Sequence, residues 1–362
     1  MNPLIRWARA GMRGLTTLFS LVLVAVAATV CLAQRYAQTN LVSDLPGMAA
    51  FTDSNLVNPW GIALGPTSPF WISDNGTGLL TLYNGAGSPQ ALVVTVPPPH
   101  DGMDPSTPTG QVFNGTQDFQ VAPGKPGIFI ACTEDGTISA WNPGVDLHQA
   151  VLVVDRSKHK AVYKGLALAN IGPNNYLYAA NFHSGKIEVF DKNFAKVHLK
   201  EDAFEDERLP EHYAPFNVQN VGGKLYVTYA KQAHSKHDEI HGAGLGFVDV
   251  FTPSGRLIQR LQHGWWLNAP WGVTLAPATF GKFSNALLVG NFGSGWIAAF
   301  NPITGAFLGL MLNTQNDPIF IDGLWALTFG NGTAAGSMTT LYFTAGINDE
   351  QDGLFGSLSP VP

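Results

Sequence analysis

Short apolar runs alternate with turns rich in Gly, Pro and Asn through most of the chain. The clearest pair of such stretches is Leu56–Gly87 and Asn268–Gly309. Both open on Pro-Trp-Gly, pass through an apolar run and a Gly-rich turn, and reach a run that ends aromatic-Asn, at Tyr83-Asn84 and Phe300-Asn301. Short apolar runs bounded by turn residues are typical of β-strands. The pattern therefore predicts a β-protein built from a repeated unit.

Less similar copies of this unit fill the rest of the chain. Five runs end in an aromatic residue followed by a polar one, at Tyr83, Trp141, Phe190, Phe251 and Phe300. First strands are expected to begin near Gly61, Asp118, Gly165, Asn217, Gly272 and Leu324. The repeat is roughly 50 residues long with four short strands, which is typical of a propeller blade. The sequence therefore predicts an all-β, six-bladed β-propeller with four-stranded blades.

The last unit is one strand short. It offers Leu324–Phe329, Thr340–Thr344 and Leu354–Ser359, while a spare strand, Tyr36–Val42, precedes the first unit. We expect this N-terminal strand to complete the last blade, because the pairing removes two open sheet edges at once. In the second unit we place the first strand at Phe119–Val121.

The first 33 residues have a different character. Three arginines precede Leu15–Val30, which is almost wholly apolar or small, and Ala33 follows where a signal peptidase would cleave. This pattern predicts a secretory signal peptide over residues 1–33. Residues 34–362 would then form one secreted or periplasmic domain with no membrane span. An N-terminal membrane anchor is the alternative, although the apolar run is short for a bilayer.

Composition agrees with a secreted β-protein. Only 13% of the residues are charged, Gly (40) and Pro (24) are plentiful, and the formal net charge is −6. An acidic chain without a long basic run is a poor partner for nucleic acid or anionic membranes. Cys132 would be the one cysteine left after cleavage, so no internal disulfide is expected. Its apolar surroundings predict a buried, unreactive thiol.

Three stretches resemble a family of uncharacterised exported bacterial proteins that are predicted to be six-bladed propellers. They are Thr39–Gly78, Tyr229–Phe251 and Phe320–Gly332, and the resemblance extends over essentially all of residues 34–362. Some members end in a PEP-CTERM sorting tail, but Leu358–Pro362 has no apolar tail of that kind, so we do not expect surface anchoring. More distantly, the chain resembles NHL-repeat propellers and calcium-dependent gluconolactonase and phosphotriesterase propellers. The resemblance implies the fold and no settled activity.

Candidate ligands are expected where loops gather at one mouth of the central channel. The loops before the first strands supply Asn58, Asp118, Lys164, Asn217, Asn268 and Asp322. The loops between second and third strands supply Asp74, Asn75, Glu134, Asp135, Asn181, His183 and Asn291. Oxygen ligands from several blades can surround Ca²⁺. Asp118, Asn217 and Asp322 are the first candidates for metal ligands, with Asn58 and Asn268 behind them. The alternative is that turns simply require these residue types.

An insertion, Lys231–Gly244, is the longest in the fourth unit. On a helix, His237 and His241 would share a face and could hold Zn²⁺, but the nearby glycines favour a solvated polar loop. The tryptophans that recur at first strands, Trp60, Trp271 and Trp325, fit either an aromatic binding floor or packing between adjacent blades.

Two classes of function remain open from the sequence. The first is an exported propeller without enzymatic activity that binds a protein, a glycan or a small molecule. The second is a Ca²⁺-dependent lactonase or esterase, in which a metal-activated water attacks a carbonyl at the channel mouth. The sequence favours the first, because it offers no catalytic motif with a fixed spacing.

Overall fold

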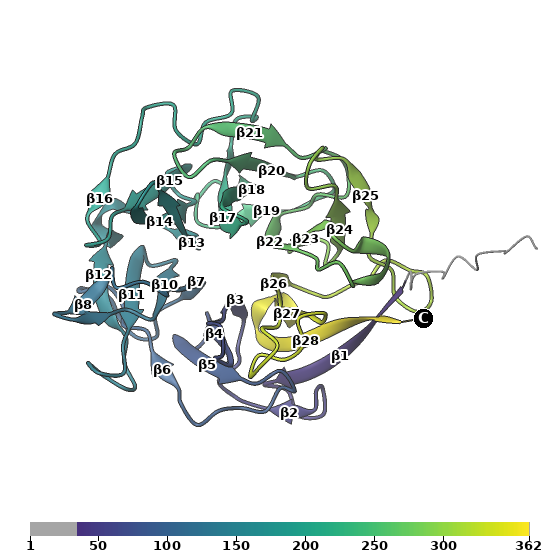
Figure 1. The fold of residues 1–362 in the computed structure, drawn as a ribbon, viewed down its shortest axis with the longest axis horizontal. Coiled ribbons are helices and arrows are strands. Elements are labelled where there is room, and N and C mark those ends of the chain that lie inside the picture. The colour runs from purple at the N-terminus through teal and green to yellow at the C-terminus, as the bar shows by residue number, and fades with distance from the viewer. Residues whose placement is uncertain (1–34, 362) are drawn as a thin grey trace, which may run out of the picture. The chain divides into compact units, whose positions relative to one another are not determined.

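A computed structural model describes residues 35–361, and the expected signal peptide lies outside this part. Six sheets of four or more strands stand around a central channel, as Figure 1 shows. A two-stranded hairpin is added to the second blade. The described helices are a short α-helical turn, α1, and two 3₁₀ turns. The prediction of a six-bladed, all-β propeller is confirmed.

Blades one to three each place their first strand innermost and their fourth outermost. Blade one consists of β3 (Pro59–Ala63), β4 (Phe70–Asp74), β5 (Leu79–Tyr83) and β6 (Val94–Thr95). Blade two consists of β7 (Pro108–Phe113), β10 (Phe129–Thr133), β11 (Thr137–Trp141) and β12 (Val151–Asp155). Blade three consists of β13 (Tyr163–Ile171), β14 (Asn174–Asn181), β15 (Lys186–Phe190) and β16 (Lys196–Val197). The 3₁₀ turn Ser157–His159 joins blades two and three.

Blades four and five repeat this order. Blade four consists of β17 (Tyr213–Val221), β18 (Lys224–Gln232), β20 (Gly246–Phe251) and β21 (Leu257–Arg260), and β19 (Glu239–Ile240) pairs antiparallel with the end of β18. Blade five consists of β22 (Pro270–Leu275), β23 (Leu287–Asn291), β24 (Ile297–Phe300) and β25 (Phe307–Leu310), with a 3₁₀ turn at Gly281–Phe283.

Blade six joins the two ends of the described chain. It contains β26 (Leu324–Phe329), β27 (Leu341–Gly346) and β28 (Asp352–Val361), with α1 (Ile347–Glu350) between the last two. β1 (Arg35–Ser43) pairs antiparallel with β28, from Arg35 opposite Val361 to Ser43 opposite Leu354, and β2 (Phe51–Thr52) adds to its edge. Figure 1 shows the purple and yellow strands side by side. The predicted ring closure is confirmed.

The aromatic residue and the polar residue that recur at the ends of third strands have two separate roles. Tyr83, Phe251 and Phe300 are fully buried at the ends of third strands. The following polar side chain accepts backbone N–H groups of its own turn, as when Asn301 Oδ1 binds the amides of Ile303 and Thr304. Such turns are a general property of Asn and Asp. The aromatic residue therefore contributes to the blade core, and the polar residue after it stabilises the following turn.

The second blade corrects one expected strand. Its innermost strand is β7, whereas Phe119–Val121 lies largely in β8 (Gln120–Ala122), which pairs only with β9 (Lys125–Pro126). The expected strand was wrong because apolar character alone does not distinguish a short side hairpin from a channel strand. Cys132 behaves as expected, since it is fully buried and burial raises the pKa of its thiol to about 12.

Candidate functional site: the channel mouth

An aromatic layer closes the channel. Trp60, Phe216, Trp271 and Trp325 occupy one position in the innermost strands of blades one, four, five and six. The rings of Trp60 and Trp325 stack with centroids 3.5 Å apart, and Trp60 meets Trp271 edge-on at 6.0 Å although their blades are not neighbours. The tryptophans therefore pack against one another across the channel axis rather than forming an open binding floor.

Glycines beside this layer let the innermost strands approach one another. A Cβ atom on Gly61 would lie 2.4 Å from the carbonyl oxygen of Thr109, and one on Gly110 would lie 2.3 Å from the amide nitrogen of Leu166. Contacts that short do not occur between real side chains and backbone, so these positions require glycine. In the Pro-Trp-Gly motif, the tryptophan thus belongs to the aromatic layer, and the glycine allows the neighbouring innermost strand to pack closely.

In blade three, Lys164 takes the position that the aromatic residues hold elsewhere. Its side chain is 2% exposed, and its Nζ lies 5.1 Å from the ring centre of Trp60 and 6.0 Å from that of Phe216. Nζ also donates a hydrogen bond of 2.5 Å to Glu134 Oε1. Burial alone would lower the pKa of Lys164, but Glu134 and Glu239 outweigh it and raise the pKa. Lys164 is therefore a charged ammonium held between aromatic rings and carboxylates.

Three glutamates surround this ammonium on one side of the aromatic layer. Glu134 follows β10 and accepts a hydrogen bond of 2.8 Å from Asn75 Nδ2. Glu239 lies on β19, and Glu350 accepts a hydrogen bond of 2.7 Å from Asn58 Nδ2. Burial raises the pKa of Glu350 to about 7, and the charges of Glu239 and Glu134 contribute to the increase. One ammonium thus faces three carboxylates that repel one another.

A strained turn holds Glu350 in this position. Asn348 (φ 56°, ψ 54°), Asp349 (φ 53°, ψ 46°) and Glu350 (φ 64°) are all left-handed, although none is glycine. This conformation costs roughly 1–2 kcal/mol for each such residue. The backbone N–H of Asn348 donates to Asp322 Oδ2, which helps to fix the turn. Strain of this kind is concentrated at functional sites in proteins.

The insertion in blade four folds across the same mouth. Lys231 and Gln232 pair with β19, and the backbone N–H of Gly242 donates to Asn268 Oδ1 at 2.6 Å. This arm is a hairpin and not a helix, so His237 and His241 do not share a helical face. His241 lies instead 6.2 Å from the ring of Phe292. The expectation of a freely solvated loop was therefore wrong for its base, although His237 and Asp238 at its tip are exposed.

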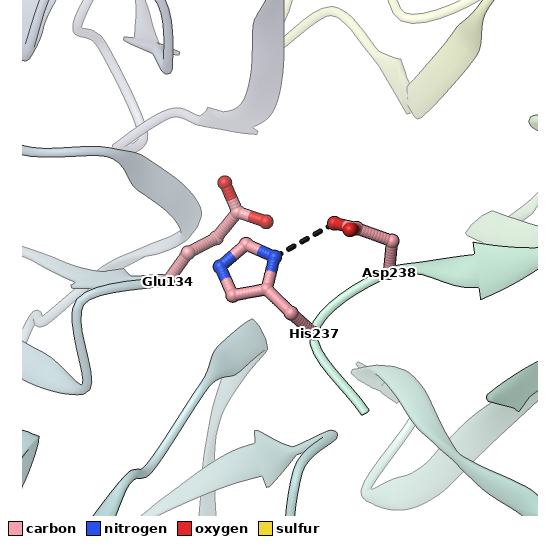
Figure 2. A group of neighbouring side chains, drawn as sticks. All are labelled: Glu134, His237 and Asp238. Carbon is pink, nitrogen blue, oxygen red and sulfur yellow. Dashed lines mark hydrogen bonds and ion pairs between the residues drawn. The ribbon is translucent and has the colours of Figure 1, made fainter. Parts of the chain in front are cut away.

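The arm brings a possible set of metal ligands together. Figure 2 shows Glu134 and Asp238 on either side of the ring of His237, with potential ligand atoms that all lie within 4.8 Å of one another. His237 Nδ1 lies 2.7 Å from Asp238 Oδ1. One imidazole and two carboxylates suit a divalent ion that accepts nitrogen and oxygen, such as Zn²⁺ or Mn²⁺, better than the all-oxygen shell of Ca²⁺.

The five residues chosen from the sequence do not meet at one point. Asn58 and Asn268 lie at the mouth, where they bind Glu350 and Gly242 through their side chains. Asp322 is exposed on the same face and caps the left-handed turn. Asn217 lies inside β17, where its Nδ2 donates to the carbonyl of Trp271.

Asp118 lies on the opposite face, in the loop after β7, and its Oδ2 accepts a hydrogen bond from Asn175 Nδ2. Its expected place at the start of a first strand was wrong, because that strand is β7. A metal site built on Asp118 together with Asp322 therefore does not fit this fold.

Among the candidate ligands predicted from the sequence, two that lie in loops between second and third strands do reach the mouth. Asn75 and Glu134 reach the mouth as expected for that set of loops. Asp135, Asn181 and Asn291 instead hold backbone groups of nearby loops, as when Asp135 Oδ2 accepts from the N–H of Thr107. The turn-forming explanation is therefore correct for part of the set.

A separate cavity occupies the channel beyond the aromatic layer. It measures about 360 Å³ and its lining includes Gln111, Asn217, Gln219 and Thr328. No residue that lines it is titratable, and it extends toward the turn between β17 and β18, on the face opposite Glu134. The channel thus has a charged mouth and an uncharged far cavity, with the aromatic rings between them.

The comparisons with known proteins establish the family and the fold. No protein-family model matches the sequence. The chain is 35% identical to Uncharacterized protein R648 of Acanthamoeba polyphaga mimivirus, over 88% of this chain and 78% of that protein. It is 32% identical to Uncharacterized protein L690 of the same virus, over 88% and 84%. These relatives are viral, so the expected bacterial origin remains an expectation.

Solved structures resemble the chain in fold alone. A protein of unknown function from Bacteroides thetaiotaomicron superposes with a TM-score of 0.57 at 11% identity, over 90% of this chain and 76% of that one. A glucose dehydrogenase superposes with a TM-score of 0.52 at 13% sequence identity, over 89% of this chain and 99% of that one. Virginiamycin B lyase from Staphylococcus aureus superposes with a TM-score of 0.50 at 12% identity, over 90% of this chain and 99% of that one. The chain therefore belongs to the same family as the mimivirus proteins R648 and L690, and its described part is a six-bladed β-propeller.

Proposed function

We propose that this chain is an exported binding module whose partner docks on the charged channel mouth. One observation supports this choice over an enzyme. The titratable groups, Glu134, Lys164, Glu239 and Glu350, lie on one side of the aromatic layer, and the 360 Å³ cavity lies on the other. Enzyme sites usually combine perturbed titratable groups and a concave pocket in one place. Here the charged groups of the mouth do not line the channel cavity.

We further propose that a divalent cation completes this mouth. The carboxylates of Glu134, Glu239 and Glu350 outnumber the single ammonium of Lys164, and a bound cation relieves their repulsion. Glu134, His237 and Asp238 are the residues that would hold it. The cation would bridge the mouth to hydroxyl or carbonyl oxygens of the partner, because the three protein ligands leave coordination positions for other oxygens.

Export is proposed from the N-terminal sequence, with the secreted or periplasmic space as the compartment. Residues 1–33 supply the basic start, the apolar run and the small residue before the cleavage point. Over residues 35–361, none of the helices has the length and apolar character needed to cross a bilayer. Within residues 35–361 the one cysteine, Cys132, is buried, so it is compatible with export but does not favour one compartment over another.

A hydrolase acting on a lactone or ester is the second candidate, and Glu350 is the observation that favours it. A carboxyl with a pKa of about 7 is suited to accept and return a proton near neutral pH. A divalent ion at Glu134, His237 and Asp238 would lower the pKa of a bound water. Glu350 would hold the proton, and Asn58 would orient its carboxylate.

Cation binding is tested by melting temperature in titrations with Mn²⁺, Zn²⁺ and Ca²⁺. We expect at least one ion to stabilise the wild type by about 3 kcal/mol at a hundredfold excess over Kd. The double variant His237→Ala with Asp238→Asn should lose most of this gain, and both side chains are exposed enough for the fold to persist. Asp317→Asn, at an exposed acid in the loop before β26, is the matched control and should keep the gain.

Two results would contradict the proposed cation site. In one, none of the three ions shifts the melting temperature of the wild type. In the other, the double variant gains as much as the wild type. Hydrolysis of a γ-lactone or of an activated ester by the metal-loaded protein, abolished in Glu350→Gln, would decide in favour of the second candidate.

A further inference from the structure

Two tryptophans that are at least partly exposed, Trp265 and Trp296, contact each other on the mouth side of blade five. Trp265 is 54% exposed and lies in the segment between β21 and β22. Its ring centre lies 5.8 Å from that of Trp296, in the turn between β23 and β24, and the two planes are perpendicular at 90°. Trp266 touches Trp265 at 5.8 Å and stacks on Phe307 at 4.0 Å, which anchors the group to the blade. We call Trp265 and Trp296 the tryptophan platform.

The platform adjoins the arm that crosses the mouth. His263 precedes it, and His263 Nε2 lies 2.9 Å from the carbonyl oxygen of Gly244, at the base of the arm. Asn268 follows it and binds Gly242. On the other side, the backbone N–H of Ile321 donates to the carbonyl of Gly295, which places the chain next to Phe320 against the turn of Trp296. Phe320, the residue before Ile321, is 64% exposed.

The size of this surface indicates a slender ligand. A tryptophan side chain covers roughly 150–250 Å² when it is completely buried. Two partly exposed indoles and one phenyl ring therefore offer on the order of 300 Å². A stable protein interface needs about 800 Å² from each partner. The platform is too small for that role by itself, but it matches a few successive rings of a chain-like ligand.

The surrounding chemistry indicates that these rings are sugars. A pyranose has an apolar C–H face that lies flat on an indole, and its edge consists of hydroxyl groups. The arm that adjoins the platform carries Asp238 and Glu239, whose carboxylates accept hydrogen bonds from hydroxyls. The same carboxylates repel an anionic polymer. Flat aromatic faces beside acidic acceptors therefore select a neutral polysaccharide.

We propose that Trp265 and Trp296 stack on sugar rings of a neutral polysaccharide that runs over blade five toward the channel mouth. This inference rests on the proposed role of the mouth as a docking surface, and it names the class of partner. The perpendicular planes require two successive sugar units to turn relative to each other. A polymer whose residues are free to rotate at each glycosidic bond meets this requirement.

The test is a titration of tryptophan fluorescence with hexasaccharides of β-1,4-glucose, β-1,3-glucose and β-1,4-N-acetylglucosamine. At least one should bind the wild type with a Kd below about 1 mM. Trp265→Ala and Trp296→Ala should each weaken binding by about tenfold or more, and Trp265→Phe should recover most of it because a flat ring remains. Met338→Ala removes an exposed side chain between β26 and β27, on the opposite face, and should bind as the wild type does.

The proposal is overturned if no hexasaccharide binds, or if the tryptophan variants bind as tightly as the wild type. A protein retained from a cell extract by the wild type and lost in Trp265→Ala, with no sugar binding, would also overturn it. The cation titration separates this failure from that of the mouth. Suppose that no sugar binds, while cations still raise the melting temperature of the Trp265→Ala variant as they do for the wild type. The sugar-binding role of the platform is then wrong, and the proposed cation site at the mouth is unaffected.

Discussion

Deleting Arg35–Asp44 is expected to remove most of the stability of the propeller. The deletion takes away β1, exposes the edge of β28 along its whole ladder, and opens two cores that contain Tyr36, Leu41 and Val42. These losses together amount to several kcal/mol, which is of the order of the total stability of many domains. Urea unfolding followed by circular dichroism measures the effect. A synthetic peptide of residues 34–45, added back, should restore part of the loss.

A point variant gives the same answer with less disruption. Tyr36 is 1% exposed, its hydroxyl donates to the carbonyl of Phe280 at 2.9 Å, and its ring lies 4.8 Å from that of Phe280. Tyr36→Ala should cost about 3–5 kcal/mol through lost burial and a cavity. Tyr36→Phe should cost less, about 1–3 kcal/mol, because it keeps the ring and removes the hydroxyl that donates to Phe280 and accepts from the N–H of Phe283. A deletion and a Tyr36→Ala variant that both unfold at the wild-type urea concentration would contradict the closure.

Replacing Lys164 with methionine is expected to have the second largest effect. The ammonium is buried between the rings of Trp60 and Phe216 and bonded to Glu134. Without it, the Glu134 carboxylate has no cation beside it and still faces Glu239 and Glu350. Breaking a buried ion pair from one side costs about 3–5 kcal/mol. We expect the free energy of unfolding to fall by that amount at pH 7.5.

The double variant Lys164→Met with Glu134→Gln is the control. It replaces the whole ion pair by groups without charge, which is often close to neutral for stability. It should therefore recover most of the loss seen in Lys164→Met. If Lys164→Met alone unfolds like the wild type, the ammonium does not balance the carboxylates as described. If the double variant is no better than the single one, the loss comes from packing in the aromatic layer.

The fold was predictable from the sequence because blades are local. Each hairpin is determined by apolar strands and by turn residues such as Asn84 and Asn301, and its contacts lie within a few tens of residues. Even the long-range closure could be inferred, because the sixth unit lacked its fourth strand and the N-terminal strand belonged to no unit. The misplaced strand of blade two had a usable signal as well, since Pro108-Thr109-Gly110 has the spacing of Pro59-Trp60-Gly61.

The site was predictable only in outline. The channel mouth was the expected place, and Glu134, Asn75, Asn58 and Lys164 were among the residues assigned to its loops. Glu350 was missed because its position depends on three successive left-handed residues without glycine, a conformation that sequence patterns do not predict. The arm with Glu239 was expected to be solvated, because its pairing with β18 and its bond to Asn268 join residues that no local pattern connects.

The central claim is that the mouth carboxylates serve binding and not stability. The folded state raises the pKa of Glu350 from 4.5 to about 7 and also raises the pKa of Glu239, mainly through burial. Between pH 4.5 and 7 the folded state therefore binds more protons than the unfolded chain, so stability falls as pH rises through this range. For Glu350 the loss approaches about 3 kcal/mol above pH 7. Carboxylates whose role is to stabilise the fold would not lower the stability of the folded state when they ionise.

Urea unfolding of Glu239→Gln with Glu350→Gln, at pH 5 and pH 8 without divalent cations, tests this claim most directly. Glutamine keeps the acceptor for Asn58 Nδ2 and cannot ionise. We expect the double variant to be more stable than the wild type by about 2–3 kcal/mol at pH 8, and its stability to fall less than that of the wild type between pH 5 and pH 8. A double variant that is less stable than the wild type at pH 8 would contradict the account, because the two carboxylates would then be structural partners of Lys164.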